Sequence, residues 1–341
     1  MSTPSDCEPS LESKVAFLRQ PCSFTEPSIR IEAIETHMSW VFLTESHAYK
    51  LKKPVHSEVL DFSTIEARHR YCEEEVHLNR RLAPDVYLDT VPLVIDAFGH
   101  LHVGGGGRAI DWLVRMRRLR AQNMLDYRLR NGTASDEDMR RIASRLADFY
   151  RNCPPVAIET GHYLNSFLQD IENRLQCLTR PDYGLPAQEW RHVCDAQCAF
   201  LRDRRDLFDA RVQAGKIIEG HGDLRPEHVC LEKEVSIIDC LEFSRSLRIT
   251  DAADELGFLA LECERLGSAH LASRLLHFYG EASGDWPDPA LLRFYQSYRA
   301  ILRASIAIRH LDEEKFRSSP EWRRRAQTYL RLAQLRTAST K

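Results

Sequence analysis

The sequence has no long apolar run, no cysteine pair with metal-binding spacing and no excess of charge of one sign. No apolar stretch approaches the ~20 residues that a membrane-spanning helix needs, which argues against a helical membrane protein. The ten cysteines are scattered and form no C-x-x-C pair, which argues against a zinc ribbon and a disulfide scaffold. Basic residues number 47 and acidic residues 50, so the net charge of −3 lacks the positive excess typical of a nucleic-acid-binding protein.

Signals for export and for two common enzyme classes are also missing. Residues 1–14 are polar and acidic without an apolar core, which is unlike a secretion signal and favours a cytoplasmic location. No G-x-x-x-x-G-K-[ST] phosphate loop and no G-x-S-x-G nucleophile motif occurs. Gly104–Gly107 is not followed by Lys-Ser or Lys-Thr and has strand-like flanks, so we expect a hairpin turn there.

The sequence divides into two parts with different patterns of apolar residues, and the boundary lies near residues 118–122. Residues 1–28 have the pattern of a polar tail followed by a short helix. Residues 29–118 alternate apolar and polar side chains in short runs, which predicts an antiparallel sheet interrupted by one helix at 62–82. Residues 119–341 have mainly helical periodicity around a strand-rich island at 216–242. The pattern therefore predicts an α+β fold with a small sheet part and a large helical part.

Capping signals indicate where helices begin. Ser63, with Glu66 three residues later, predicts a capping box for the first long helix. Ser135 is the expected N-cap of a helix that ends before Pro154. Further helices are expected at 162–180, 187–213, 251–283, 288–312 and 320–337.

The most informative stretch is His221-Gly222-Asp223, which Asp239 follows sixteen residues later. Gly222 permits a close backbone approach in a tight loop, and Asp239 stands after two isoleucines that suit the end of a buried strand. A short hairpin between the two carboxylates would bring them together, so that one orients a hydroxyl and the other holds a divalent cation. Phosphoryl transfer needs this division, because positioning and charge neutralisation stabilise its transition state. A single loop aspartate is usually a turn residue, but the ordered pair behind a histidine favours function.

This stretch resembles the catalytic and metal loops of the protein-kinase-like superfamily. It is most similar to the aminoglycoside phosphotransferase and choline kinase branch, whose loop is H-G-D-x-x-x-x-N, and the similarity runs from about Ile29 to about Leu261. More narrowly, T-H-M-S-W-V-F-L, Y-K-L-K-K-P-V and V-R-M-R-R-L resemble a poorly characterised bacterial subgroup that is aminoglycoside phosphotransferase-like. The resemblance implies a two-lobed fold. Residues 29–118 would be a nucleotide-binding N-lobe and residues 119–341 a helical C-lobe carrying the catalytic and metal loops at 216–243.

The resemblance also implies roles for the residues of these loops. Asp223 would accept or orient the proton of the substrate hydroxyl, and His221 would support the loop. Arg225 would contact the transferred phosphoryl group through its guanidinium. Asp239 would bind Mg²⁺ that bridges the ATP phosphates. Glu255 would either hydrogen-bond the catalytic loop or be an ordinary acid at a helix N-terminus.

The nucleotide-binding residues follow from the same resemblance. Lys50 would bind the ATP phosphates and be held by Glu75 on the helix at 62–82. Lys52 lies two residues from Lys50 and therefore on the same face of a strand, so it is an alternative to Lys50. The segment with Met116 and Arg118 would meet adenine between the lobes.

The sequence departs from the family pattern at two places. His228 stands where the family has an asparagine that binds metal, and Mg²⁺ prefers oxygen ligands. Glu227 or Glu242 would supply the missing oxygen, and Glu242 is the preferred candidate. The loop that should cover the phosphates has no glycine, so the hydroxyl of Ser39 is expected to take part.

Together these features predict a phosphotransferase that uses ATP and Mg²⁺ and acts on a hydroxyl of a small molecule. Two alternatives stay open: a nucleotide-binding regulatory module with little catalysis, and an enzyme that transfers AMP. The acceptor site is expected in the helical half, from Glu262, Glu264 and the helices of residues 288–312. Aminoglycosides are cations and would need an acidic wall there, which the mixed charge of this half neither requires nor excludes.

Overall fold

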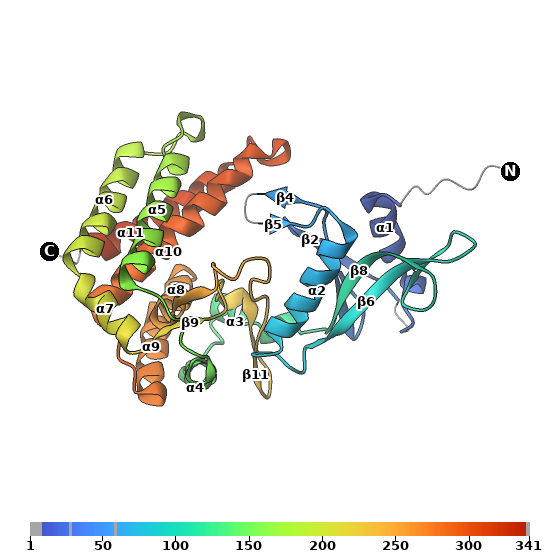
Figure 1. The fold of residues 1–341 in the computed structure, drawn as a ribbon, viewed down its shortest axis with the longest axis horizontal. Helices are drawn as coiled ribbons and strands as arrows, with labels where there is room; N and C mark the ends of the chain where they lie inside the picture. Colours follow the sequence, from blue (N-terminus) through green and yellow to red (C-terminus); the bar gives the residue numbers. More distant parts are fainter. Residues whose placement is uncertain (1–8, 27–28, 58–59, 339–341) are drawn as a thin grey trace. The chain divides into compact units, whose positions relative to one another are not determined.

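The computed structural model describes residues 9–26, 29–57 and 60–338, and the chain forms two compact units (Figure 1). The sheet unit comprises Met1–Tyr127 and Glu227–Leu247, and the helical unit comprises Arg128–Pro226 and Arg248–Lys341. The predicted α+β fold is confirmed, since an antiparallel sheet occupies the first unit and helices dominate the second. The lobe boundaries implied by the resemblance stay a prediction.

A six-stranded antiparallel sheet with the order β1-β2-β3-β8-β6-β7 forms the centre of the sheet unit. Its strands are β1 (Glu32–Glu35), β2 (Ser39–Leu43), β3 (His47–Lys52), β6 (Tyr87–Ile95), β7 (Leu101–Val103) and β8 (Arg108–Arg117). The other elements of this unit are α1 (Leu11–Leu18), the pair β4 (His56–Ser57) and β5 (Leu60–Asp61), α2 (Ile65–Asn79), and the hairpin of β10 (Val229–Leu231) and β11 (Val235–Ile237).

The glycine run Gly104–Gly107 is not the hairpin turn that its flanks predicted. It connects β7 to β8, and these strands are not neighbours because β6 lies between them. A Cβ atom at Gly107 would lie 2.7 Å from the carbonyl oxygen of Ile95, so only glycine lets the chain pass the end of β6. The hairpin turn of this region is the one at Gly99, between β6 and β7, where φ is +86°.

Helix α2 packs against β6 and β8 (Figure 1). Its N-cap is Thr64, whose hydroxyl accepts the N–H of Ala67 at 3.1 Å, and not the predicted Ser63. The hydroxyl of Ser63 donates to Asp61 Oδ1 at 2.5 Å instead. Because Asp61 occupies that hydroxyl, the next hydroxyl residue along the chain caps the helix.

The helical unit contains eight long or medium helices in its described part. They are α4 (Asp136–Asn152), α5 (Thr160–Leu178), α6 (Ala187–Asp203), α7 (Arg205–Gln213), α8 (Ala252–Arg265), α9 (Ala269–Ser283), α10 (Pro289–Arg309) and α11 (Pro320–Ala338). A two-stranded antiparallel sheet of β9 (Ile217–Glu219) and β12 (Ile249–Asp251) also belongs to this unit. Helix α10 packs against α5, α8 and α11, so it lies at the centre of this unit (Figure 1).

Two of the predicted helices are each broken into two. The segment 187–213 breaks at Arg204, whose backbone leaves the helical region, and separates α6 from α7. The segment 251–283 breaks after Arg265, because Gly267 adopts a φ of +89° that ends α8. The N-cap predicted at Ser135 is present, and Asp138 completes a capping box with it.

Each unit has its own apolar core. In the sheet unit, Phe42, Leu51 and Leu113 are among the buried residues on one side of the sheet, and Cys72 of α2 joins Met116 on the other. In the helical unit, a large core surrounds Trp190 and Tyr295. The nine cysteines in the described part of the chain are free, and Cys7 lies outside it. No helix in residues 9–26, 29–57 and 60–338 is both long enough and apolar enough to cross a membrane.

Candidate functional site

Strand β3 carries two lysines toward the same glutamate of α2. Lys50 and Lys52 alternate with Leu51 along the strand and therefore share one face. Lys50 Nζ donates to Glu75 Oε1 at 2.8 Å, and Lys52 Nζ donates to Glu75 Oε2 at 2.5 Å. Glu75 is fully buried, and each of its two carboxylate oxygens accepts a hydrogen bond from one ammonium group. The predicted Lys50–Glu75 ion pair is present, and Lys52 shares it.

Two further carboxylates complete this group of charges. Lys50 also donates to Asp239 Oδ1 at 2.8 Å, and Lys52 also donates to Glu242. We call these two lysines and three carboxylates (Glu75, Asp239 and Glu242) the lysine–carboxylate cluster. All five lie in the sheet unit. Within the cluster, one carboxylate is in excess over the ammonium groups.

The cluster shifts the acidities of its members. Burial acts to lower the pKa of Lys50, but Asp239 and Glu75 hold it well above its usual value. Burial likewise acts to raise the pKa of Glu75, and Lys50 and Lys52 outweigh it, so that the pKa of Glu75 is lowered. For Glu242, burial prevails over the attraction of Lys52 and raises the pKa. Both lysines and Glu75 are therefore charged near neutral pH, and Glu242 holds its charge least firmly.

Asp239 is the exposed member of the cluster. It follows β11 and has a φ of +63°, and no other non-glycine residue in the described part of the chain has a positive φ. Its N–H donates to the hydroxyl of Tyr87 at 3.1 Å, and the next N–H, of Cys240, donates to Asn79 Oδ1 at 2.9 Å. These bonds fix a backbone conformation that costs about 1–2 kcal/mol for a residue with a Cβ atom. Strain of this kind concentrates at functional sites, and 46% of the Asp239 side chain is exposed.

His228 lies beside Asp239, as the pairing of β10 with β11 dictates. Val229 pairs with Ile237, and His228 Nε2 lies 3.4 Å from Asp239 Oδ2. Glu242, the preferred third ligand, is bound by Lys52 instead. No group of three or more His, Cys, Asp or Glu residues in the described ranges is arranged to hold a metal ion. The structure thus brings two of the three predicted metal ligands, Asp239 and His228, side by side.

The chemistry of Asp239 fits one way of holding Mg²⁺. Mg²⁺ is usually bound through one or two carboxylates together with substrate phosphates and water, so a complete protein cage is not required. An exposed carboxylate at the edge of a cluster with one negative charge in excess meets that requirement. His228 is better suited to bind a phosphate or a water molecule than the metal itself.

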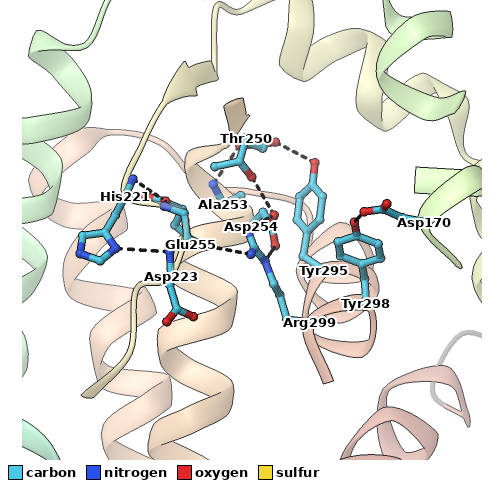
Figure 2. A network of polar contacts seen from close by, with 12 residues as sticks. Asp170, His221, Asp223, Thr250, Ala253, Asp254, Glu255, Tyr295, Tyr298 and Arg299 are labelled. Atoms are coloured by element: carbon cyan, nitrogen blue, oxygen red, sulfur yellow. Dashed lines mark hydrogen bonds and ion pairs between the residues drawn. The ribbon is translucent and has the colours of Figure 1, made fainter. Parts of the chain in front are cut away.

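The His221-Gly222-Asp223 loop belongs to the helical unit and follows β9. Glu255, near the start of α8, accepts the N–H groups of His221 and Gly222 on Oε1 at 2.6 and 2.5 Å (Figure 2). Its Oε2 accepts the hydroxyl of Tyr150 at 3.0 Å. Glu255 is 1% exposed, and burial raises its pKa. Of the two interpretations that the sequence left open, the structure selects the carboxyl group that fastens the loop.

Arg299 of α10 fastens the same loop from its carbonyl side. Its Nη1 donates to the carbonyl oxygen of Gly222 at 3.1 Å, while Nε and Nη2 donate to Asp254 at 2.8 and 2.6 Å (Figure 2). Thr250 also donates to Asp254, at 2.7 Å. A Cβ atom at Gly220 would lie 2.6 Å from the carboxyl group of Glu255, so glycine is required for this close approach. Backbone groups of the loop are thus held on both sides.

The carboxylate of Asp223 points away from this network (Figure 2). Its N–H donates to His221 Nδ1 at 3.3 Å, which fits the supporting role expected of that histidine. Arg225 Nε donates to Asp223 Oδ2 at 2.9 Å. A second arginine, Arg303 of α10, places Nη1 3.9 Å from Asp223 Oδ1. With 21% of its side chain exposed, Asp223 is held in position and remains accessible.

The other three nucleotide-binding predictions also lie in the sheet unit, and Ser39 of β2 pairs in register with Lys52 of β3. Ser39 is 2% exposed at the start of β2, where its N–H and carbonyl group bond to Thr36. Met116 is buried between β3 and α2. Arg118 donates to the carbonyl oxygen of Thr44 at 2.5 Å and lines a pocket of about 560 Å³. The pocket is lined by Glu45, Arg117, Arg118, Arg120, Asn123, Glu232 and Lys233, so no member of the lysine–carboxylate cluster faces it.

Several residues of the site carry no signal in the sequence. Asn79 and Tyr87 bind the backbone at Asp239 and Cys240 across more than 150 positions of the chain. Arg299 and Arg303 are two of many arginines on amphipathic helices. The sequence pointed to these two arginines only indirectly, because it placed the helices of residues 288–312, which include α10, at the expected acceptor site.

Comparisons with known proteins agree with this architecture. No protein-family model matches the chain. Uncharacterised proteins of Mycobacterium tuberculosis and Mycobacterium bovis are 33% identical over 282 residues, which is 81% of this chain and 54% of theirs. The chain therefore spans about half the length of the curated relatives it matches.

Solved structures with the same fold include three small-molecule kinases or phosphotransferases. A choline/ethanolamine kinase family protein from Mesorhizobium loti has a TM-score of 0.55 at 15% identity, covering 95% of this chain and 93% of its own. A choline kinase from Cryptosporidium parvum has a TM-score of 0.53 at 9% identity, covering 96% and 94%. A thermostable mutant of an aminoglycoside phosphotransferase has a TM-score of 0.51 at 10% identity, covering 89% and 95%. The protein-kinase-like fold predicted from the sequence is confirmed.

Proposed function

We propose that the protein transfers the γ-phosphoryl group of ATP, with Mg²⁺, to a hydroxyl group of a small molecule. The observation that carries this proposal is the lysine–carboxylate cluster, in which the Lys50–Glu75 ion pair extends to the strained, exposed Asp239. A fold shared with choline kinases and an aminoglycoside phosphotransferase agrees with it. The proposal requires that the cluster and the Asp223 loop serve one reaction.

Each residue then has a defined task. Lys50 binds phosphate oxygens of ATP, with Glu75 keeping its ammonium group in place. Asp239 holds Mg²⁺, which neutralises charge on the phosphates when it is bound. Arg225 leaves Asp223 to contact the transferred group, since a guanidinium can bind two phosphoryl oxygens at once.

The chemical step balances without a further reactant. A bond forms between the acceptor oxygen and the γ-phosphorus, and the bond from that phosphorus to the bridging oxygen breaks, which releases ADP. The hydroxyl proton passes to Asp223 or, through it, to solvent. The transition state spreads charge over the phosphoryl oxygens, so positioning and positive charge account for most of the catalysis.

Two variants of this chain test the proposal. Asp223→Ala should retain Mg²⁺-ATP binding and lower ADP formation by about 10²–10⁴-fold, the usual share of a general base. Asp239→Ala should weaken Mg²⁺-ATP binding about tenfold or more. Asp148→Ala, on the exposed face of α4, is the matched control and should behave like the parent. Calorimetry measures binding, and a coupled assay measures ADP; parent-like turnover in both active-site variants refutes the proposal.

A regulatory nucleotide-binding module is the second candidate, because His228 stands at the position of the second metal ligand. Under this candidate the parent binds Mg²⁺-ATP but releases no ADP with any acceptor. Pyrophosphate in place of ADP would instead indicate transfer of AMP.

A further inference from the structure

Arg303 is a largely buried arginine of the helical unit that lies beside Asp223. Its Nη1 lies 3.9 Å from Asp223 Oδ1, which is an ion-pair distance but too long for a hydrogen bond. Only 12% of the Arg303 side chain is exposed. Its Nε is buried, and no hydrogen-bond partner for it occurs in the part of the chain that the structure describes. A buried donor without a partner is unfavourable, and the Nε groups of Arg145 and Arg293 share this feature, so the position beside Asp223 is what distinguishes Arg303.

The two acids of the expected acceptor region, Glu262 and Glu264, are each paired with a basic side chain. Glu262 accepts from the hydroxyl of Tyr329 at 2.7 Å and from Arg265 at 2.8 Å. Glu264 is bound by Arg336. Both acids that the sequence offered as an acidic wall are therefore paired with arginines of the same unit. The charge that the helical unit presents next to Asp223 comes from the guanidinium groups of Arg225 and Arg303.

We propose that the hydroxyl acceptor carries an oxyanion group, a carboxylate or a phosphate ester, and that Arg303 binds it. This inference rests on the proposed function and adds the class of substrate. A guanidinium presents a planar fork of donors that matches an oxyanion, and at 3.9 Å from Asp223 Oδ1 the Nη1 group of Arg303 makes no hydrogen bond to that carboxylate. The same guanidinium repels ammonium groups, so choline and aminoglycosides are disfavoured as acceptors.

Matched acceptors test the class of substrate. Glycerol, glycerate, glycerol 3-phosphate and choline form one set, and glucose, glucuronate, glucose 6-phosphate and glucosamine form another. We expect the oxyanion members to have a kcat/KM for ADP formation at least tenfold above the neutral and cationic members of their set, since a charged hydrogen bond contributes about that factor. The carboxylate and phosphate arms distinguish the two sources of the oxyanion.

Variants at Arg303 test the assignment to this residue. Arg303→Gln should abolish the preference, bringing the ratio of kcat/KM between anionic and neutral members close to one, and Arg303→Lys should restore part of it. Arg331→Gln, an exposed arginine of α11, is the control and should keep the parent ratio. A better rate with neutral or cationic members in the parent overturns the proposal. An equal loss on every acceptor in Arg303→Gln also overturns it, because Arg303 would then serve the transferred phosphoryl group.

A binding measurement tests the same assignment without turnover. Glycerol 3-phosphate, compared with glycerol at equal ionic strength, should raise the Tm of the parent and of Arg331→Gln, and should raise that of Arg303→Gln much less. Equal shifts in all three proteins overturn the inference. Failure of the proposed function gives a different result: Mg²⁺-ATP neither binds nor yields ADP, whether or not glycerol 3-phosphate raises the Tm.

Discussion

Glu255 is a fully buried carboxyl group surrounded by donors. Loss of hydration on burial raises its pKa, and this effect outweighs the backbone N–H groups of the loop, the charge of Arg299 and the hydroxyl of Tyr150, which all favour the ionised form. A raised pKa in the folded state means that Glu255 contributes stability fully below pH 4.5 and loses that contribution as pH rises through the raised value. The His221-Gly222-Asp223 loop is therefore held by a group whose charge is sensitive to pH.

Glu255→Gln, which cannot ionise, isolates this effect. The free energy of unfolding of the parent minus that of Glu255→Gln should fall as pH rises from about 4 to about 8, as urea midpoints at several pH values would show. Glu172→Gln, at an exposed position of α5, provides the reference and should give no such fall. A difference that grows with pH would mean that the pKa of Glu255 is lowered, against the direction inferred here.

At the residue scale the sequence predicts candidate residues but not their contacts. His221, Asp223 and Asp239 became candidates because their spacing is local, with a short hairpin between the two carboxylates. Arg303 lies 80 positions from Asp223, and nothing in a helical pattern distinguishes an arginine that faces a carboxylate from one that faces water. Contacts of this kind depend on how helices pack, which a single sequence does not specify.

Among the elements, β3 shows most clearly how a strand pattern becomes a charge network. The period of two puts Lys50 and Lys52 on one face, and the buried Glu75 of α2 takes both. Lys52 is fully buried, whereas 14% of Lys50 is exposed beside Asp239. Under the proposed function Lys50 is the lysine that binds a phosphate, while Lys52 ties the segment after β11 to the sheet through Glu242.

This division predicts different consequences for the two lysines. Lys52→Met should lower the free energy of unfolding by about 3–5 kcal/mol, because it leaves a buried carboxylate without its ammonium partner. Lys50→Met should cost less, since Glu75 keeps Lys52, and should chiefly weaken Mg²⁺-ATP binding. Chemical denaturation and calorimetry separate the two effects.

The double variant Lys52→Met with Glu242→Leu serves as the control for the ion pair. Removing both charges should restore much of the lost stability, because apolar side chains of similar volume often replace a buried pair well. If the double variant is as unstable as Lys52→Met, the loss comes from packing and not from the unpaired charge.

Capping residues show where local rules succeed for an element and where they fail. The N-cap predicted at Ser135 is confirmed, and its partner Asp138 lies within the same turn. The cap at Ser63 moved to Thr64, since Asp61 binds the Ser63 hydroxyl first. The breaks at Arg204 and Gly267 were missed because apolar periodicity continues across them, and the crossing at Gly104–Gly107 depends on strand order.

On the scale of the whole molecule, the chain passes between its two units three times. Residues 1–127 begin the sheet unit, and Glu227–Leu247 return to it from the middle of the helical unit. This returning segment carries Asp239 and Glu242 and is joined at both ends to residues of the helical unit. On one side stands Pro226, three residues after Asp223, and on the other Arg248, which is bound to Glu219 at 2.7 Å.

Such a chain path couples the stability of the units through the covalent backbone. Losing the sheet unit frees Glu227–Leu247 and thereby removes the fixed ends from the Asp223 loop and β12, so the two units should unfold in one cooperative transition. Lys52→Met, which acts inside the sheet unit, should then speed hydrogen exchange of the slowest amides in α8 and α10 by the same factor as those in α2, as mass spectrometry of peptides would show. Faster exchange confined to α2 and the sheet would mean that the units unfold separately and that the returning segment transmits no stability.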